Sequence, residues 1–452
     1  MPLIACLDIG STFTKAALVD VSGGGLLAAS SSATTSITDV MHGVQQCLDD
    51  VAARVGRNAD EVRLCSSAGG GLRLAVVGYE RAVSAEAGRR VALTAGGHVV
   101  HVTSGLLRPT DVQELLAARP DVVLLVGGTD GGNAEVLLAN AHSLARSNLP
   151  APVVAAGNAD VRDDVVDLLR AGDVVVHAVD NVLPAIGTLD PQPARAALRG
   201  MFLEHVIGGK HLSSSRDFAA LVRAATPDAV LAGVELFADG AGSVPGAGDV
   251  LVVDIGGATT DVYSVVTRDP EDASLGRDVV ELQRRQRTVE GDLGMRWSAP
   301  GVVSAAVTEQ LLEQGDLEGL ASVAARRHHD PGLLPVDHAD CAVDHQLARL
   351  ALTIALRRHA RPSLDRDVRV PGVDLRQVQT VIGSGGVLRH SEPKAAREIL
   401  APALSDVTGG WRMPERADLR LDRRYVLAAA GLLAHDHAEA AAGLLRTHLA
   451  EG

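Results

Sequence analysis

Two short stretches of the chain carry the residue types that phosphate and metal chemistry needs. Residues Ala5–Lys15 read ACLDIGSTFTK, and Leu251–Asp261 read LVVDIGGATTD, so that Asp8 aligns with Asp254. Each stretch predicts an apolar strand that ends near an aspartate, then a turn rich in glycine and hydroxyl groups, then a second apolar strand. Paired hairpin tips of this kind can hold a phosphate chain from two sides, with the two aspartates facing a metal ion between them.

The two predicted tips suit phosphate binding through the backbone. Closely spaced N–H groups in a glycine-rich turn supply many donors where side chains would crowd the anion, and hydroxyl groups add further donors. The chain contains no GxxxxGK[ST] motif, so it is not a P-loop protein. The candidate phosphate-binding residues are Gly10, Ser11, Thr12, Gly256, Gly257, Ala258 and Thr259.

Four charged residues in the hairpins are candidates for catalysis. Asp8 and Asp254 are predicted to hold Mg²⁺ mostly through water, because Mg²⁺ gives up its hydration shell reluctantly. Asp261 could orient or deprotonate an attacking water. Lys15 aligns with Asp261 and is one of very few lysines in an arginine-rich chain, which favours a site that needs a compact ammonium group. Chance retention of this lysine is the alternative.

A third glycine-rich turn follows the second hairpin. Val378–Ile382 predicts a strand that opens into Gly383-Ser384-Gly385-Gly386. One DxGxT motif alone would say little, since strands often end in Asp and turns contain Gly. Two copies followed in order by this third turn predict a nucleotide-binding protein with two lobes that close over ATP and Mg²⁺.

Residues 85–195 alternate between short apolar strands and helical stretches, which predicts an inserted parallel sheet covered on both faces. The turn at Gly127–Asn133 follows the second of these strands, at the edge where such sheets bind ligands. Asp130 and Asn133 either contact a ligand or cap a helix. The predicted strands are His98–Val102, Val122–Val126, Val153–Ala156 and Val174–Val179, and the predicted helices are Thr110–Ala118, Asn133–Ser147 and Val161–Ala171.

The remaining segments are predicted to be mainly helical. Residues 195–240 and 302–312 read as helices, 315–345 as a loop-rich helical insertion with surface histidines, and Tyr425–Ala434 as an apolar helix able to pack closely on another. The expected domains are a first lobe at 1–84, an inserted α/β subdomain at 85–195, a helical connection at 196–249, a second lobe at 250–425 and a C-terminal helical return at 426–452.

Composition excludes several classes of protein. The hydrophobic content of 46% and charged content of 22% are ordinary for a soluble globular protein. A net charge of −14 argues against nucleic acid or an anionic membrane as partner. The four scattered cysteines include no CxxC pair, which argues against disulfides, zinc and iron–sulfur clusters. With no signal peptide and no apolar run of the ~18–20 residues that span a bilayer, a cytoplasmic protein is expected.

The order of the three turns resembles that of the actin, Hsp70 and sugar-kinase superfamily. Within it, the chain resembles the glutamate mutase L family, also called methylaspartate mutase accessory protein. The resemblance implies an α/β protein with a two-lobed actin-like fold, a duplicated ribonuclease-H-like ATPase architecture that here carries the inserted parallel α/β subdomain. The segments that carry it are Asp8–Lys15, Cys65–Arg73, Leu124–Asn133, Asn181–Pro184, Asp254–Asp261, Thr288–Gly294 and Gly383–Gly386.

The resemblance also implies residue roles and a partner. Asp8 and Asp254 would hold Mg²⁺, the two tips would line the phosphates, and Gly383, Ser384, Gly385 and Gly386 would face the adenosine. Glu235, on a helix before the second hairpin, could offer a catalytic carboxylate, although a surface charge is the favoured interpretation. Family members accompany adenosylcobalamin-dependent mutases and are thought to reactivate them by helping to release damaged cobalamin.

Other functions remain open at this stage. A small-molecule kinase of the same fold would need a catalytic aspartate outside the hairpins, and no such motif is found. An iron–sulfur activator lacks its paired cysteines, and nothing supports a cytoskeletal filament. A scaffold that binds ATP without hydrolysing it remains a second possibility. The sequence leaves the particular mutase and the oligomeric state open.

Overall fold

A computed structural model describes most of the chain, which divides into two compact units. The first unit comprises Met1–Gly70, Leu212–Thr267 and Arg284–Gly452, and the second comprises Gly71–His211 and Arg268–Gln283. The described residues are 1–35, 38–67, 72–94, 97–201, 212–213, 215, 218–267, 284–361, 363–365, 368–370 and 372–449. Each unit is considered separately below.

The first sheet of the first unit has the strand order β10-β4-β1-β2-β3. Strand β2 is antiparallel to β1 and to β3, whereas β4 runs parallel to β1 and β10 parallel to β4. The helix α1 (Val40–Val55) buries Val40, Val44 and Val51, as their spacing predicts, and Asp39 caps its first turn. The strands are β1 (Leu3–Ile9), β2 (Phe13–Asp20), β3 (Gly25–Ala33), β4 (Glu61–Ser66) and β10 (Val222–Ala225).

The second sheet repeats the first, strand for strand. Its order is β15-β14-β13-β18-β19, with β13–β14 and β14–β15 antiparallel and β13–β18 and β18–β19 parallel. Strand β13 therefore corresponds to β1, and the hairpin β13–β14 corresponds to β1–β2. The duplicated hairpins that the sequence repeat predicts are confirmed. The strands are β13 (Val250–Ile255), β14 (Thr260–Val265), β15 (Arg285–Glu290), β18 (Thr380–Ser384) and β19 (Asp418–Leu421).

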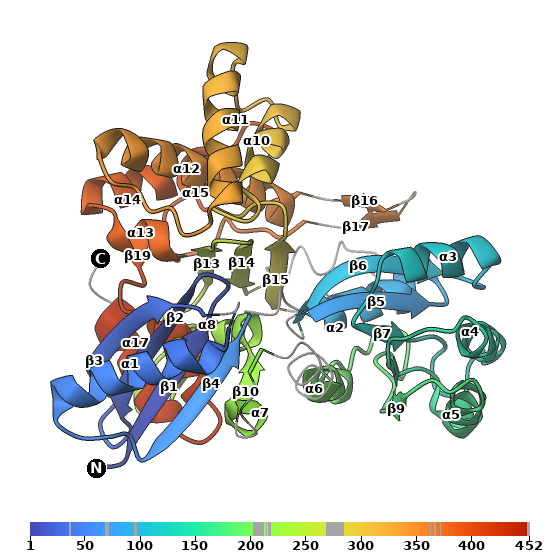
Figure 1. Cartoon of the computed structure of the whole chain (residues 1–452). Helices are drawn as coiled ribbons and strands as arrows, with labels where there is room; N and C mark the ends of the chain where they lie inside the picture. Colours follow the sequence, from blue (N-terminus) through green and yellow to red (C-terminus); the bar gives the residue numbers. More distant parts are fainter. Residues whose placement is uncertain are drawn as a thin grey trace. The chain divides into compact units, whose positions relative to one another are not determined.

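Two hydrophobic cores hold the first unit together. One packs the second sheet against the helices that follow it, which Figure 1 shows in yellow and orange. The other joins buried side chains of both sheets, such as Cys6 and Val252, to α8, α16 and α17. The helices are α7 (Phe218–Leu221), α8 (Thr226–Asp239), α10 (Ala299–Thr308), α11 (Gln314–His329), α12 (His338–Ala360), α13 (Gly386–His390), α14 (Pro393–Leu400), α15 (Pro402–Ser405), α16 (Val426–Leu433) and α17 (Ala438–Leu449).

Helices α8 and α16 pack at very short range because each has a glycine at the crossing. A Cβ on Gly431 would lie 1.7 Å from the Ala229 carbonyl oxygen, and one on Gly233 would lie 2.2 Å from that of Leu427. The close helix contact predicted for the apolar C-terminal helix is therefore confirmed. Both helices bury apolar side chains along most of their length, and such burial is worth about 25 cal/mol for each Å².

The second unit contains a parallel sheet of order β6-β5-β7-β8-β9, with a core formed with its helices. All the strands and helices predicted for residues 98–179 are present. The elements are β5 (Leu72–Gly78), η1 (Arg81–Ala85), α2 (Glu86–Thr94), β6 (Gly97–Ser104), α3 (Pro109–Ala117), β7 (Val122–Leu125), α4 (Glu135–Ala145), β8 (Val153–Ala155), η2 (Ala159–Val161), α5 (Arg162–Ala171), β9 (Val176–Ala178) and α6 (Gln192–Met201).

The turn at Gly127–Asn133 has structural partners within this unit. Asp130 accepts hydrogen bonds from the backbone N–H of Ala159 (2.9 Å) and the side chain of Asn181 (2.8 Å). Asn133 accepts a longer one, at 3.4 Å, from the N–H of Val136 in the first turn of α4. These contacts favour the helix-capping alternative for Asn133 and a loop-bracing role for Asp130.

The structure differs from the expected organisation in two places. The second unit spans 71–211 rather than 85–195, because β5 pairs with both β6 and β7 in the middle of the parallel sheet. The segment 195–240, expected to be helical, contains the strand β10, because Val222, Ala224 and Ala225 are buried beside β4. Two small hairpins complete the fold, β11 (Gly240–Ala241) with β12 (Val244–Pro245) and β16 (Ser363–Asp365) with β17 (Val368–Val370).

Candidate functional site

The two hairpin tips close in the same way and lie against each other. The Gly10 N–H donates to the Phe13 carbonyl at 3.1 Å, and the Gly256 N–H donates to the Thr259 carbonyl at 2.8 Å. A Cβ on Gly257 would come within 2.6 Å of the Thr12 hydroxyl oxygen. A larger residue at this position would force the Thr12 side chain to move, so glycine lets the second tip approach the first this closely.

Opposite charges face each other across the first hairpin. Asp8 and Lys15 are register partners in β1 and β2, and the Lys15 ammonium lies 3.2 Å from the Asp8 carboxylate. The other carboxylate oxygen accepts a 2.6 Å hydrogen bond from Thr226, which begins helix α8. Asp8 is buried, at 8% exposed, so these two partners offset much of the cost of removing its charge from water.

Lys15 also lies over an aromatic ring. Its ammonium is 4.1 Å from the ring centroid of Tyr425, and the Arg389 guanidinium lies 4.5 Å from the same centroid. Burial alone would lower the pKa of Lys15. The carboxylates of Asp8 and Asp254 and the ring of Tyr425 outweigh burial, so its pKa is raised and the ammonium stays charged.

Like charges face each other across the second hairpin. Asp254 and Asp261 occupy the register positions that Asp8 and Lys15 hold in the first. Burial raises the pKa of Asp254 to about 6, with Asp261 and Asp8 adding to the rise while Lys15 and a hydrogen bond from Ser384 oppose it. This hairpin therefore carries an excess of negative charge that a cation would relieve.

Asp261 and Arg287 leave buried polar atoms without hydrogen-bond partners. The Arg287 guanidinium lies 3.8 Å from the Asp261 carboxylate, and the Tyr263 hydroxyl donates to that carboxylate at 3.2 Å. Among the described residues, the second Asp261 oxygen and two Arg287 nitrogens have no partner. Burial raises the pKa of Asp261, and Arg287 opposes the rise. Unmet buried groups of this kind suit a site that is completed by water or ligand.

A loop after β15 holds the second tip by its carbonyl groups. The Met295 N–H donates to the Gly256 carbonyl at 3.0 Å, and the Arg296 and Trp297 N–H groups donate to the Gly257 carbonyl at 2.8 and 2.9 Å. The protein itself thus engages the carbonyl groups of Gly256 and Gly257, while the Gly256 N–H donates within the tip.

The third glycine-rich turn lies beside Asp254. Ser384 is the register partner of Asp254 at the end of β18, and Gly385 and Gly386 lead into helix α13. Gly385 has φ of +105°, and a Cβ there would lie 2.2 Å from the Ile255 carbonyl oxygen. Glycine is therefore required where this turn crosses β13. The structure brings all three predicted turns to one end of the two sheets.

These residues fit a magnesium–nucleotide complex. Two glycine-rich tips offer N–H donors, and the unmet hydroxyl of Thr12 and the unmet oxygen of Asp261 offer further ligand contacts. No group of three His, Cys, Asp or Glu side chains among the described residues forms a ready metal cluster. Asp8 and Asp254 stand at matching register positions at the bases of the two tips, and with water and phosphate oxygens they would form a ligand set of the kind that Mg²⁺ usually keeps.

Three further residues join the site that sequence reasoning missed. Thr226 donates to Asp8, and Tyr425 lies between Lys15 and Arg389 with φ of +55°, a rare conformation for a side chain of this size. Asp422 accepts the N–H groups of Val426 and Leu427, and burial raises its pKa to about 6. An aspartate just before an apolar helix is a capping signal that the sequence does contain.

Glu235 contacts an arginine of β15, outside the hairpin tips. It forms a 3.7 Å ion pair with Arg285, and Asp239 binds the same arginine. This contact favours the interpretation of Glu235 as a charge on the surface of α8 over a catalytic role. No helix of the described residues is long and apolar enough to cross a membrane.

Two sheets of the same strand order, each with a glycine-rich hairpin at one end, define a protein of the actin-like ATPase fold, as predicted. The model of the MutL protein family matches residues 4–449 of this chain. Protein MutL of Clostridium tetanomorphum is 34% identical over 458 residues, which cover 98% of each chain. The chain belongs to the MutL family, the glutamate mutase L family that its motifs resemble.

Solved structures show more distant likeness. A nucleotide-free acetone carboxylase is 14% identical with a TM-score of 0.40, covering 96% of this chain and 70% of that one. A nucleotide-free diol dehydratase-reactivating factor is 13% identical with a TM-score of 0.37, and the match covers 97% of this chain and 100% of that one. At such low similarity, the fold assignment depends on the strand order of the two sheets.

Proposed function

We propose that this protein is a cytoplasmic, Mg²⁺-dependent ATPase that serves an adenosylcobalamin-dependent mutase as a reactivating accessory protein. Membership of the MutL family supports the accessory role. The nucleotide part of the proposal comes from the site itself. The single observation that carries it is the meeting of two duplicated hairpin tips, with Gly257 against Thr12 and a carboxylate at the base of each tip.

Each residue has a proposed part in this function. Asp8 and Asp254 hold the metal, and Lys15 neutralises phosphate charge near them. Asp261 orients the attacking water, with Arg287 keeping its carboxylate ionised beside Asp254.

The remaining proposed contacts come from the three turns. Their N–H groups hold the nucleotide at fixed points on two sheets, so that bound ATP links the sheets and its hydrolysis releases them. The phosphate contacts are Gly10, Ser11, Thr12, Gly256, Gly257, Ala258 and Thr259, and the adenosine contacts are Gly383, Ser384, Gly385 and Gly386.

Calorimetry tests the nucleotide part of the proposal. ATP and ADP should bind the purified protein only when Mg²⁺ is present, and phosphate release should be slow and Mg²⁺-dependent. Absence of heat at millimolar nucleotide with Mg²⁺ would refute the proposal. Binding without any phosphate release would leave an ATP-binding scaffold instead of an ATPase.

Reactivation tests the partner. A cobalamin-dependent mutase from the same source is inactivated by turnover, then mixed with this protein, ATP, Mg²⁺ and fresh adenosylcobalamin. Mutase activity should recover, and it should stay low when ATP is omitted. A reactivating protein must bind one state of the mutase better than the other, since equal affinity shifts nothing. Equal recovery with and without ATP would remove the reactivating role.

A further inference from the structure

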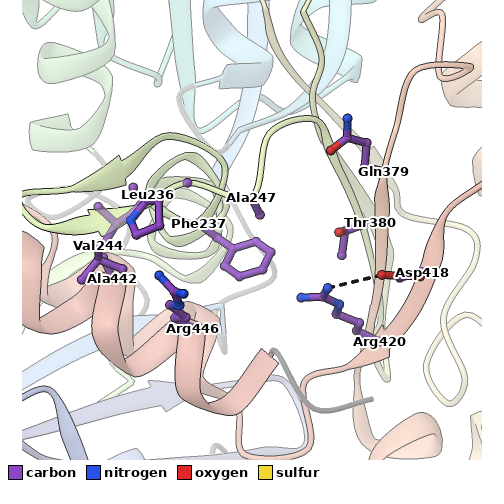
Figure 2. A pocket seen from close by; sticks show the side chains of 13 residues that line it. Leu236, Phe237, Val244, Ala247, Gln379, Thr380, Asp418, Arg420, Ala442 and Arg446 are labelled. Atoms are coloured by element: carbon purple, nitrogen blue, oxygen red, sulfur yellow. Dashed lines mark hydrogen bonds and ion pairs between the residues drawn. The ribbon is translucent and has the colours of Figure 1, made fainter.

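A pocket of about 320 Å³ lies in the first unit, away from the hairpin tips (Figure 2). Gln379 and Thr380 line it at the beginning of β18, whereas Ser384, at the far end of the same strand, faces Asp254. The pocket is thus at the opposite end of the second sheet from the nucleotide site. Its volume is at the small end of the range for ligand pockets.

The pocket combines an apolar wall with two arginines. Phe237 of α8 and Ala442 of α17 are buried apolar residues of the lining. Figure 2 shows Phe237 between Arg446 and Arg420 in this view. Arg420 donates to the Leu449 carbonyl at 3.1 Å. Arg446 is exposed on α17 and forms no hydrogen bond or ion pair with any other residue that the structure describes.

The charge balance of the pocket favours an anion. Among its lining residues, Asp418 is the acidic one, and it lies 3.5 Å from Arg420 and is exposed. One guanidinium is therefore partly neutralised and the other is not. In a chain with a net charge of −14, an arginine pair beside an apolar wall is a local exception to the overall charge. Guanidinium groups bind carboxylates by paired, charge-assisted hydrogen bonds.

The rim of the pocket is built before any ligand binds. Gly240 and Gly246 cross so closely in the β11–β12 hairpin that a Cβ on Gly240 would lie 2.4 Å from the Gly246 nitrogen. The Ser243 hydroxyl and N–H both donate to Glu439 of α17, at 2.5 and 3.1 Å. The hairpin is thereby fixed to the helix that carries Arg446. A preformed rim lowers the entropy lost on binding.

We propose that this pocket is a binding site for a ligand with a small apolar group and a carboxylate. The carboxylate binds Arg446 and Arg420, and the apolar group packs on Phe237. The C-terminal residue of a polypeptide, with an apolar side chain next to its free carboxylate, has this chemistry and this size. A small free organic acid has them as well.

The pocket shares two structural elements with the nucleotide site. Helix α8 begins at Thr226, which donates to Asp8, and places Phe237 in the pocket wall near its other end. Strand β18 begins at Thr380 in the pocket and ends at Ser384 beside Asp254. We expect ligand in the pocket to change nucleotide affinity through these elements, and nucleotide would then change ligand affinity by the same factor. This coupling rests on the proposed nucleotide site, whereas ligand binding itself does not.

Hexanoate and hexan-1-ol test the ligand chemistry, because they match in apolar length and differ in the carboxylate. Ligand-detected NMR on the full-length protein should show saturable hexanoate binding, and hexan-1-ol should bind about tenfold more weakly. Arg446→Gln should weaken hexanoate binding about tenfold as well. Arg397→Gln, an exposed arginine on α14, is the matched control and should change nothing. Equal binding to wild type and Arg446→Gln, or no binding at about 20 mM, would overturn the proposal.

A peptide that ends in leucine identifies the source of the ligand. If the C-terminus of a protein occupies the pocket, the peptide with a free C-terminal carboxylate should bind more tightly than hexanoate. The same peptide with an amidated C-terminus should bind poorly. If a free acid is the natural ligand, hexanoate should bind at least as well. ADP affinity measured with and without hexanoate tests the coupling, and an unchanged ADP affinity would contradict it. Loss of ADP binding alone would refute the nucleotide proposal and leave the pocket proposal standing.

Discussion

The two phosphate hairpins share one backbone and differ in charge. In β1–β2 the carboxylate of Asp8 faces the ammonium of Lys15 at 3.2 Å. In β13–β14 the carboxylate of Asp254 faces another carboxylate, Asp261, and Arg287 lies 3.8 Å behind. The first hairpin has a facing counter-charge without any ligand, whereas in the second two carboxylates face each other and Lys15 and Arg287 oppose only part of the resulting rise in their pKa values.

This difference in charge predicts that the two hairpins respond differently to Mg²⁺. A balanced, buried pair keeps its geometry without metal, so the first hairpin can act as a fixed support. The unbalanced pair gains most from Mg²⁺, because the metal removes a repulsion that burial makes strong. The two tips share one backbone, and the difference between Lys15 and Asp261 at the matching register position leaves Asp254 without a facing counter-charge.

The largest expected effect is on catalysis and should be similar for both hairpins. Asp8→Asn and Asp254→Asn should each lower ATPase activity about tenfold or more, because each removes one charge from the metal site. Phosphate release at saturating Mg²⁺ and ATP is the measurement. Asp20→Asn, at the far end of β2, is the control. Wild-type turnover in either metal-site variant would remove that aspartate from the site.

Removing the counter-charge that faces Asp8 in the first hairpin should destabilise the metal-free protein. Lys15→Gln leaves Asp8 buried without its counter-charge and should lower the free energy of unfolding by about 3 kcal/mol. Urea unfolding without Mg²⁺ measures the change. Lys394→Gln is the matched control, because this lysine is exposed and its ion pair with Glu398 is 3.9 Å long. It should change stability by less than about 0.5 kcal/mol. Equal effects of the two changes would contradict the balanced-pair interpretation.

The unbalanced hairpin should give the metal-free protein a pH dependence. Burial raises the pKa of Asp254 to about 6, above its ordinary 3.8, so the folded protein binds a proton that the unfolded chain releases. Stability from this group is therefore complete below about pH 4 and is lost as the pH rises through about 6.

Asp254→Asn should remove the contribution of Asp254 to the pH-dependent loss of stability, which is on the order of 2 kcal/mol between pH 4 and 7. Asp422, whose pKa burial also raises to about 6, should account for a further part. Unfolding at several pH values in chelator measures the slope, with Lys394→Gln as control. If the unfolding free energy changed with pH equally in wild type and Asp254→Asn, the pKa of Asp254 would not be raised in the folded protein.

The smallest effects separate ligand contacts from structural contacts among the threonines of the tips. The Thr12 hydroxyl has no partner among the described residues, whereas the Thr260 hydroxyl donates to the Leu293 carbonyl at 2.5 Å. Thr12→Val should leave stability almost unchanged and weaken nucleotide binding severalfold. Thr260→Val should cost about 1–3 kcal/mol of stability. The opposite pattern in unfolding and calorimetry would mean that Thr12 is structural.

Much of this site could be predicted from the sequence because its residues are local. A strand, an aspartate and a glycine turn follow one another within a few residues, and the second copy identified the first. Thr226 and Tyr425 could not be found in this way, since they reach Asp8 and Lys15 only through folding over more than two hundred residues of chain. Arg287 stands in a run of arginines and polar residues that is typical of a solvated face, yet it is 3% exposed because β15 pairs with β14.

The limits of the inserted subdomain were missed for a related physical reason. Strand β5 has the same apolar character as a strand of the first lobe, and only its pairing with β6 and β7 assigns it to the parallel sheet. Strand β10 is rich in alanine, which favours helix locally, and burial beside β4 overrides that preference. Residues 68–71, within the segment Cys65–Arg73 that carries the family resemblance, lie outside the described residues.

The central claim is that both hairpins hold one metal–nucleotide complex, and a double-mutant cycle tests it most directly. The affinity for Mg²⁺–ATP is measured by calorimetry for wild type, Asp8→Asn, Asp254→Asn and the double variant. If the two carboxylates act on the same metal, the second substitution should cost much less than the first, with a coupling of about 1 kcal/mol or more. Losses that add within about 0.5 kcal/mol would contradict a shared metal and separate the hairpins into independent sites.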